Sequence, residues 1–97
     1  MNVGAVTIRL EPVTTDACKQ LHADYVTVRL LTTYVGRGTQ WSEEAATEAM
    51  HSLACGDIAL FKGRLLLDPP TVLHRSPPIA GTGERRLLLV IDPVHAA

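Results

Sequence analysis

Three side chains of this sequence, His22, Asp24 and His74, are of the types that hold a divalent metal ion. In an extended segment, residues i and i+2 point to the same face, so His22 and Asp24 offer an imidazole and a carboxylate to one ion. His74 ends another expected strand and is our candidate for the third ligand. Two histidines and one carboxylate on one face leave three octahedral positions open, as in non-haem Fe(II) oxygenases. Zinc, manganese, cobalt and nickel accept the same ligands, so the ligand types do not fix the metal.

A single His-x-Asp motif is weak evidence. Four histidines in 97 residues give about a one in five chance of such a motif by accident. The alternative is that His22 and Asp24 are solvated turn residues. Cys18 lies four residues before His22 and could complete a zinc site with Asp24 or Cys55. The alternative for both cysteines is that they are small buried hydrophobic residues.

Short strands are the elements that would have to position these side chains. Alternating or β-branched runs predict strands over residues 6–10, 25–35, 58–61, 65–67, 71–74 and 85–91. Asp16 and its neighbours can cap a helical turn over 17–21, and Ser42 can cap a short helix that runs to about residue 53. Parallel strands would need a helix between them, and the chain leaves no room for that. We therefore expect a mainly β protein, an antiparallel barrel or sandwich with one or two short helices.

Composition excludes several classes of function. The chain has 97 residues, 46% of them hydrophobic and 20% charged, which is typical of one globular domain. A formal net charge of -1 without a block of like charge argues against nucleic-acid and membrane-surface partners. The longest apolar run, residues 87–91, is too short to span a bilayer, and residues 1–10 do not read as a secretory signal. With only two cysteines, we expect a reduced, cytoplasmic setting.

The order of the motifs resembles the prolyl-hydroxylase-like branch of the 2-oxoglutarate- and Fe(II)-dependent oxygenases. In that pattern, H-x-D is followed by R-x-L-T-x-Y-L, a Gly-rich turn with an aromatic residue, a Gly-Asp turn into a strand ending in Phe, H-x-x-x-P-V and G-x-R. The matching segments here are 22–24, 29–35, 38–41, 56–61, 74–79 and 83–85. The resemblance implies a small double-stranded β-helix, the jelly-roll barrel of the cupins.

A narrower resemblance is to an uncharacterised bacterial family, the DUF1826 proteins. It is carried by CKQLHADYVTVRLLTTYVGRGTQW, GDIALFKG and VLHRSPP. Members of that family are about twice this long. The resemblance implies that residues 1–97 form a single double-stranded β-helix domain, either a short member or the C-terminal part of a longer architecture.

The resemblance also implies roles for particular residues. His22, Asp24 and His74 match the iron ligands, and Arg85 matches the residue that pairs with the distal carboxylate of the cosubstrate 2-oxoglutarate. Tyr34 stands where its hydroxyl could reach the same carboxylate. Arg86 is a rival, because neighbours along a strand point to opposite faces. Arg85 shares its strand face only with the apolar residues Leu87, Leu89 and Ile91. We therefore expect Arg85, and not Arg86, to face inward.

Two functions remain open at this point. One is an Fe(II)/2-oxoglutarate-dependent oxygenase domain, and the other is a non-enzymatic metal-binding module that holds zinc. A third reading is a domain completed by a partner chain, because the open edges of a small barrel invite pairing. The substrate and the oligomeric state are not readable from the sequence.

Overall fold

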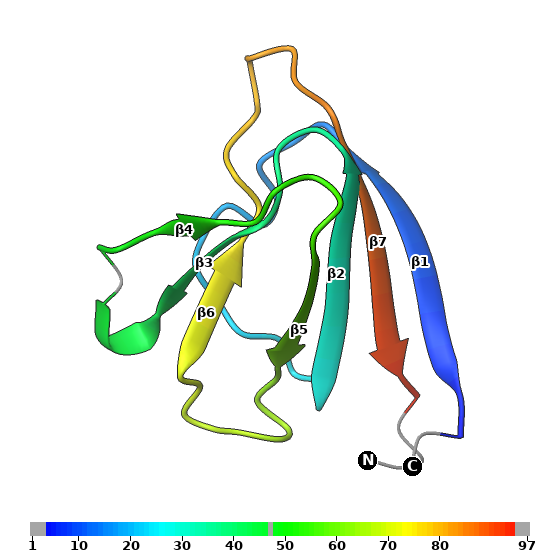
Figure 1. Cartoon of the computed structure of the whole chain (residues 1–97), viewed down its shortest axis with the longest axis vertical. Helices are drawn as coiled ribbons and strands as arrows, with labels where there is room; N and C mark the ends of the chain where they lie inside the picture. The colour runs from blue at the N-terminus through cyan, green and yellow to red at the C-terminus, as the bar shows by residue number, and fades with distance from the viewer. Residues whose placement is uncertain (1–3, 47, 95–97) are drawn as a thin grey trace.

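The computed structural model describes residues 4–46 and 48–94. It consists of two antiparallel sheets (Figure 1). The larger sheet has the strand order β1-β7-β2-β5, with bounds Val6–Val13, Arg86–Pro93, Val28–Val35 and Ile58–Lys62. The smaller sheet has the order β4-β3-β6, with bounds His51–Ser52, Gln40–Glu43 and Val72–Arg75. A single 3₁₀ turn, η1 (Glu44–Ala46), is the helical element of the described residues.

An isolated bridge between His22 and His74 adds the segment around His22 to the smaller sheet, beside β6. Counted along the chain, this segment is the second of eight strand positions. With it, the chain crosses between the two sheets at every step except the hairpin of positions four and five. The larger sheet takes positions one, eight, three and six, and the smaller takes five, four, seven and two. Alternation of this kind between two four-stranded antiparallel sheets is the jelly roll of the cupins. The expectation of a mainly β, jelly-roll fold is confirmed.

The core lies between the sheets and is small. Its buried cluster comes from the larger sheet and consists of Leu31, Phe61, Leu88 and Val90. Partly buried side chains from both sheets pack against it, among them Val13, Trp41, Leu53 and Val72. Polar side chains share this interior, because Thr33, His74 and Arg86 are buried as well. The barrel interior therefore holds a polar site beside a short apolar core.

The expected helix from Ser42 to about residue 53 is wrong. Residues 40–43 instead pair with β6, and a 3₁₀ turn and the short strand β4 follow within the described residues. The Ser42 hydroxyl is fully buried and donates to the carbonyls of Ala46 (2.6 Å) and Ala49 (3.0 Å), so it ties the turn back to the sheet rather than capping a helix. Pairing with β6 overrides the local helix propensity of this alanine- and glutamate-rich segment.

Two further expectations differ from the structure. Residues 65–67 form a turn and not a strand, since the amides of Leu66 and Leu67 both donate to Gly63 O at 3.0 Å. Residues 17–21 form no helix, and the turn there is closed by a bond of 3.2 Å from Lys19 N to Asp16 O.

The first strand continues through Pro12 to Val13. Among the described strands β1 pairs with β7 alone, so Pro12 sits on an edge, where its missing N–H is tolerated. In the described part of the chain, no helix is long and apolar enough to cross a bilayer.

Candidate metal centre

The structure brings His22, Asp24 and His74 together on the inner face of the smaller sheet, as the sequence analysis expected. The backbones of His22 and His74 exchange two hydrogen bonds, N to O, of 3.0 and 2.9 Å. A pair bonded in this way points both side chains to the same face. Asp24 follows His22 by two residues and shares that face. Donor atoms of the three residues lie within 4.8 Å of one another.

The spacing of these donor atoms fits one ion. Ligand atoms that share an ion stand roughly 3 Å apart, because each metal–ligand bond is about 2.1 Å long. His22 Nε2 lies 3.3 Å from Asp24 Oδ1, and His74 Nε2 lies 3.1 Å from Asp24 Oδ2. Asp24 Oδ2 is buried and accepts no well-aligned hydrogen bond. Its neighbours are Arg29 Nη1 at 2.9 Å and His74 Nε2 at 3.1 Å, so an ion bound by the two imidazoles would be a better-placed partner for this buried oxygen.

The orientation of His22 suits a ligand. Its Nδ1 lies 2.7 Å from the carbonyl oxygen of Gln20. A carbonyl can only accept, so Nδ1 carries the hydrogen and Nε2 keeps its lone pair for an ion. Contact with the Asp24 carboxylate, opposed by burial, raises the pKa of the His22 imidazole above its ordinary value.

Arg29 and Asp92 hold Asp24 in place from the larger sheet. Arg29 Nε and Nη2 donate two parallel hydrogen bonds, of 2.7 and 2.8 Å, to the two carboxylate oxygens of Asp92. Arg29 Nη1 lies 2.9 Å from Asp24 Oδ2. The hydrogen bond to Asp92 raises the pKa of Arg29. Burial disfavours the ionised Asp24 carboxyl, but contacts with His22 and His74 and the charge of Arg29 outweigh it and hold its pKa well below the usual range. Asp24 is therefore a fixed carboxylate.

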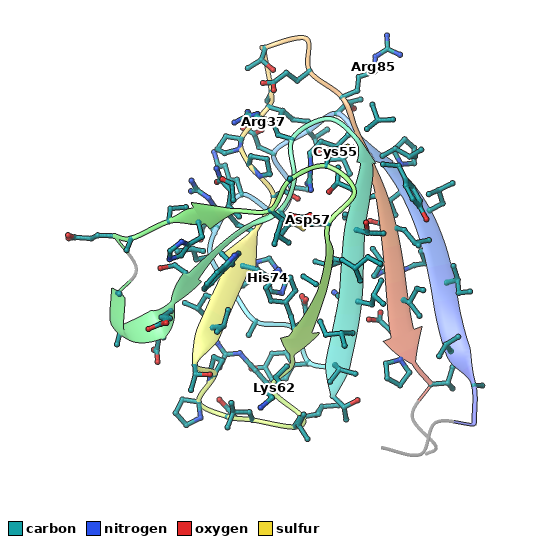
Figure 2. All side chains as sticks on the ribbon, viewed as in Figure 1. Arg37, Cys55, Asp57, Lys62, His74 and Arg85 are labelled. Atoms are coloured by element: carbon teal, nitrogen blue, oxygen red, sulfur yellow. The ribbon has the colours of Figure 1, made fainter. Side chains whose placement is uncertain are left out.

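His74 is the most enclosed of the three donors, at 5% exposure. Its ring lies 4.4 Å from that of Phe61 and 4.7 Å from that of His22, measured between centroids. Its strand neighbour Trp41 stacks at 4.3 Å on the exposed His51. Figure 2 shows His74 in the space between the two sheets. These aromatic neighbours restrict the ring and keep water from its inner side.

A cavity of about 140 Å³ lies beside the three donors. It extends past Leu88 to Thr39 and Ser76, with Arg9 and Arg75 also in its wall. A larger cavity of about 480 Å³ is lined by mostly apolar side chains of β5 and the smaller sheet, and none of the three donors lines it. The small cavity is therefore the one that all three donors line.

The expected orientation of Arg85 is wrong. Arg85 is exposed and points away from the barrel (Figure 2), whereas Arg86 is 2% exposed in the interior. Arg86 donates from Nε to Arg37 O (2.7 Å), from Nη1 to Ser76 Oγ (2.7 Å) and from Nη2 to Thr39 Oγ1 (3.1 Å) and Thr33 Oγ1 (3.2 Å). No carboxylate among the described residues pairs with it within 4.0 Å. Burial, with a smaller contribution from the charge of Arg37, lowers its pKa.

Tyr34 does not stand where the sequence analysis placed it. A bulge between Thr33 and Val35 turns the strand at this point, and Tyr34 is 54% exposed. It is absent from the wall of the small cavity. Cys18 and Cys55 are both exposed free thiols, so the alternative of small buried residues is also wrong. Neither cysteine belongs to the donor cluster of the described residues.

The sequence analysis assigned no role to Arg29 or Asp92. Both are charged residues that alternate with buried apolar ones on strands of the larger sheet, Arg29 with Leu31 and Asp92 with Val90. A charge on the buried face of a strand is the signal that could have found them, because such a charge needs a partner there.

Comparisons with known proteins agree with this fold. The structure is similar to "Hydroxypropylphosphonic acid epoxidase from S. wedmorenis", with a TM-score of 0.56 and 15% sequence identity over 90% of this chain and 42% of that one. The chain thus spans about two fifths of the length of that protein, and at this identity the likeness concerns the fold alone. No curated protein matches the sequence. The family described as "Protein of unknown function (DUF1826)" matches residues 1–92, and the chain therefore belongs to the DUF1826 family.

Proposed function

We propose that this domain binds Fe(II) through His22, Asp24 and His74 and acts as a 2-oxoglutarate-dependent oxygenase. The observation that carries the metal part is the convergence of the three donor atoms around the buried Asp24 Oδ2. Two histidines and one carboxylate are the ligand set of non-haem Fe(II) oxygenases. Bound there, the metal would supply oxygen activation, with 2-oxoglutarate as the electron donor.

The residues around the donors have separate tasks. The Gln20 carbonyl keeps Nε2 of His22 free, and the Arg29–Asp92 pair fixes the angle of the Asp24 carboxylate. Such outer partners orient ligands and strengthen metal binding. Phe61 covers the ring of His74 and keeps that side of the site dry.

The cosubstrate part rests on Arg86. A buried guanidinium without a carboxylate partner is expensive, and a ligand carboxylate would offset that cost. The Thr39 and Ser76 hydroxyls accept hydrogen bonds from Arg86, so their own hydrogens remain to be donated. Both residues line the small cavity. We therefore assign the distal carboxylate of 2-oxoglutarate to these two hydroxyls, with the charge of Arg86 behind them, in place of Arg85 and Tyr34.

The size of the cavity is consistent with a small acid. At about 140 Å³ it is well below the roughly 300–1,000 Å³ of pockets that enclose drug-sized ligands. The keto-acid end of the cosubstrate would face the three donors, and its distal carboxylate would face Thr39 and Ser76.

A second candidate function is a non-enzymatic metal-binding module that holds zinc. The observation that favours it is the donor set itself, because two imidazoles and one carboxylate also hold zinc and leave a fourth position to water. In this module the Arg29–Asp92 pair would orient the Asp24 carboxylate, and no cosubstrate would bind.

The two candidates separate in one experiment. We expect Fe(II) and 2-oxoglutarate together, without oxygen, to raise the melting temperature by about 10 °C or more at one hundred times their dissociation constants, by mass action. Oxygen should then yield succinate. A shift with metal alone, with no further shift from 2-oxoglutarate and no succinate, would select the zinc module. No shift with either ligand would reject both.

Matched arginine variants test the cosubstrate assignment. Arg86→Lys should keep the shift with Fe(II) and lose the further shift with 2-oxoglutarate, because lysine lacks the planar fork. Arg85→Lys should keep both shifts. If Arg86→Lys does not fold, Ser76→Ala removes one of the hydroxyl donors and serves in its place.

A further inference from the structure

The outer face of the larger sheet is apolar across all four strands. Residues on this face alternate with the inward ones and align in rows, for example Ile8, Ile91, Leu30 and Leu60. We call it the outer apolar face; it consists of Val6, Ile8, Leu10, Pro12, Val28, Leu30, Thr32, Val35, Ile58, Leu60, Lys62, Leu87, Leu89, Ile91 and Pro93. Thr32 and Lys62 are its two polar members.

Most of this face is open to solvent in the single chain, although Thr32 at its centre is only 6% exposed. The side chains on its two edge strands stand furthest out, with Leu60 at 69%, Ile58 at 68% and Ile8 at 63% exposure. An antiparallel sheet with one face toward solvent usually carries polar residues there. Monomeric proteins rarely expose a contiguous apolar patch of more than a few hundred Å². We therefore expect another protein surface to cover the outer apolar face.

We propose that the cover is the same face of a second copy of this chain. Six aliphatic side chains of the face, each 49–69% exposed, together leave roughly 650 Å² accessible, which lies within the range of areas that one partner contributes to a standard interface; they are Val6, Ile8, Leu10, Val35, Ile58 and Leu60. A two-fold dimer needs a patch that is complementary to itself. A flat sheet of aliphatic side chains meets that requirement, since two such faces stack about 10 Å apart as in a β-sandwich.

The placement of charge favours this pairing. Lys62 lies at one end of the face and Arg85 at the other, so the centre is free of charge (Figure 2). Within the described residues, no acidic side chain belongs to the face, which argues against a basic partner surface. Charged side chains of the same strands lie on the opposite face, where Arg9, Glu11 and Arg29 line the small cavity and Asp92 pairs with Arg29. Dimerisation would leave both metal sites open.

Sedimentation of the 97-residue chain tests this proposal, in metal-free buffer so that the proposed function plays no part. The expected result is a reversible dimer of twice the 10.5 kDa chain mass, with a dissociation constant in the micromolar range or below. A monomer at all concentrations up to about 500 µM would overturn the proposal.

Two matched lysine variants locate the interface. Leu10→Lys lies on the outer apolar face and Leu66→Lys lies outside it, at similar exposure of 57% and 52%. Leu10→Lys should raise the dissociation constant at least about 100-fold, because the two-fold axis buries the new charge twice, and Leu66→Lys should leave it unchanged. Ile58→Lys, on the opposite edge strand, should act like Leu10→Lys if the latter does not fold. Equal effects of Leu10→Lys and Leu66→Lys, or none from either face variant, would contradict the proposal.

Discussion

His22 and His74 bond each other's backbone in both directions, and their imidazole centroids lie 4.7 Å apart although 51 residues separate them in the chain. This one bridge places the early His-x-Asp segment beside β6 and completes the smaller sheet. The metal donors and the jelly-roll topology therefore depend on the same contact. A change that breaks the bridge should disturb the site and the fold together.

Loss of the Asp92 carboxylate should weaken metal binding without removing a ligand. In Asp92→Asn, Arg29 loses its charged partner and is free to pair more closely with Asp24. We expect the affinity for Fe(II) or Zn(II) to fall about 10- to 100-fold, the usual effect of an outer partner. Competition titration with a chelating dye measures it. Asp68→Asn, which disrupts the exposed pair with Arg64, is the control and should bind metal as the native chain does.

Gly38 should tolerate no side chain. A Cβ atom on it would lie 1.9 Å from the carbonyl oxygen of Leu53, where the loop before Thr39 passes the backbone of the smaller sheet. We expect Gly38→Ala to lower the free energy of unfolding by about 2–4 kcal/mol, measured by urea denaturation. Gly4→Ala meets nothing within 4 Å and should change it by less than about 0.5 kcal/mol. Equal stabilities of the two variants would show that the loop can move aside.

Asp16 should make the fold sensitive to acid. Its Oδ1 accepts hydrogen bonds from the amides of Ala80 (2.8 Å) and Ile79 (2.7 Å), and these bonds lower the pKa of the carboxyl below the ordinary aspartate value of 3.8. A lowered pKa means stability that is present above pH 3.8 and is lost as the pH falls through the folded-state value. Asp16→Asn keeps an acceptor but loses the charge. Its stability deficit in urea should be larger at pH 7 than at pH 3, and a deficit independent of pH would refute this role.

The three metal ligands could be predicted from the sequence, because they lie in local motifs whose order and spacing are typical of such sites. His22 and Asp24 share a face by strand periodicity alone. His74 is predicted as their partner both by its place at the end of another expected strand and by the resemblance. The same alternation predicts the wrong inward residue for the pair Arg85 and Arg86. A wholly apolar face usually faces the interior, whereas here the inward side of β7 serves a polar site and the outward side carries the aliphatic residues. Periodicity separates two faces of a strand but does not say which one is covered by further protein.

Tertiary pairing explains the other differences. The segment after Trp41 has strong helix formers, yet its first residues complete a ladder with β6, and the buried Ser42 hydroxyl binds carbonyls that a helix would have used internally. The run at residues 65–67 is apolar, but its backbone bonds to Gly63 and Val26 as a turn. The contact of Arg29 with Asp92 exists because β2 pairs with β7. No local sequence pattern specifies that pairing, so the roles of these two residues could not be predicted.

Metal stoichiometry is the most direct test of the central claim. Equilibrium dialysis against Fe(II) without oxygen, followed by metal analysis, should give one ion per chain for the native protein. His74→Ala should bind less than a tenth of that amount, whereas His51→Ala, which changes an exposed histidine outside the donor cluster, should bind one ion. Binding of one ion by His74→Ala, or of none by the native chain, would contradict the assignment of His22, Asp24 and His74 as a metal site.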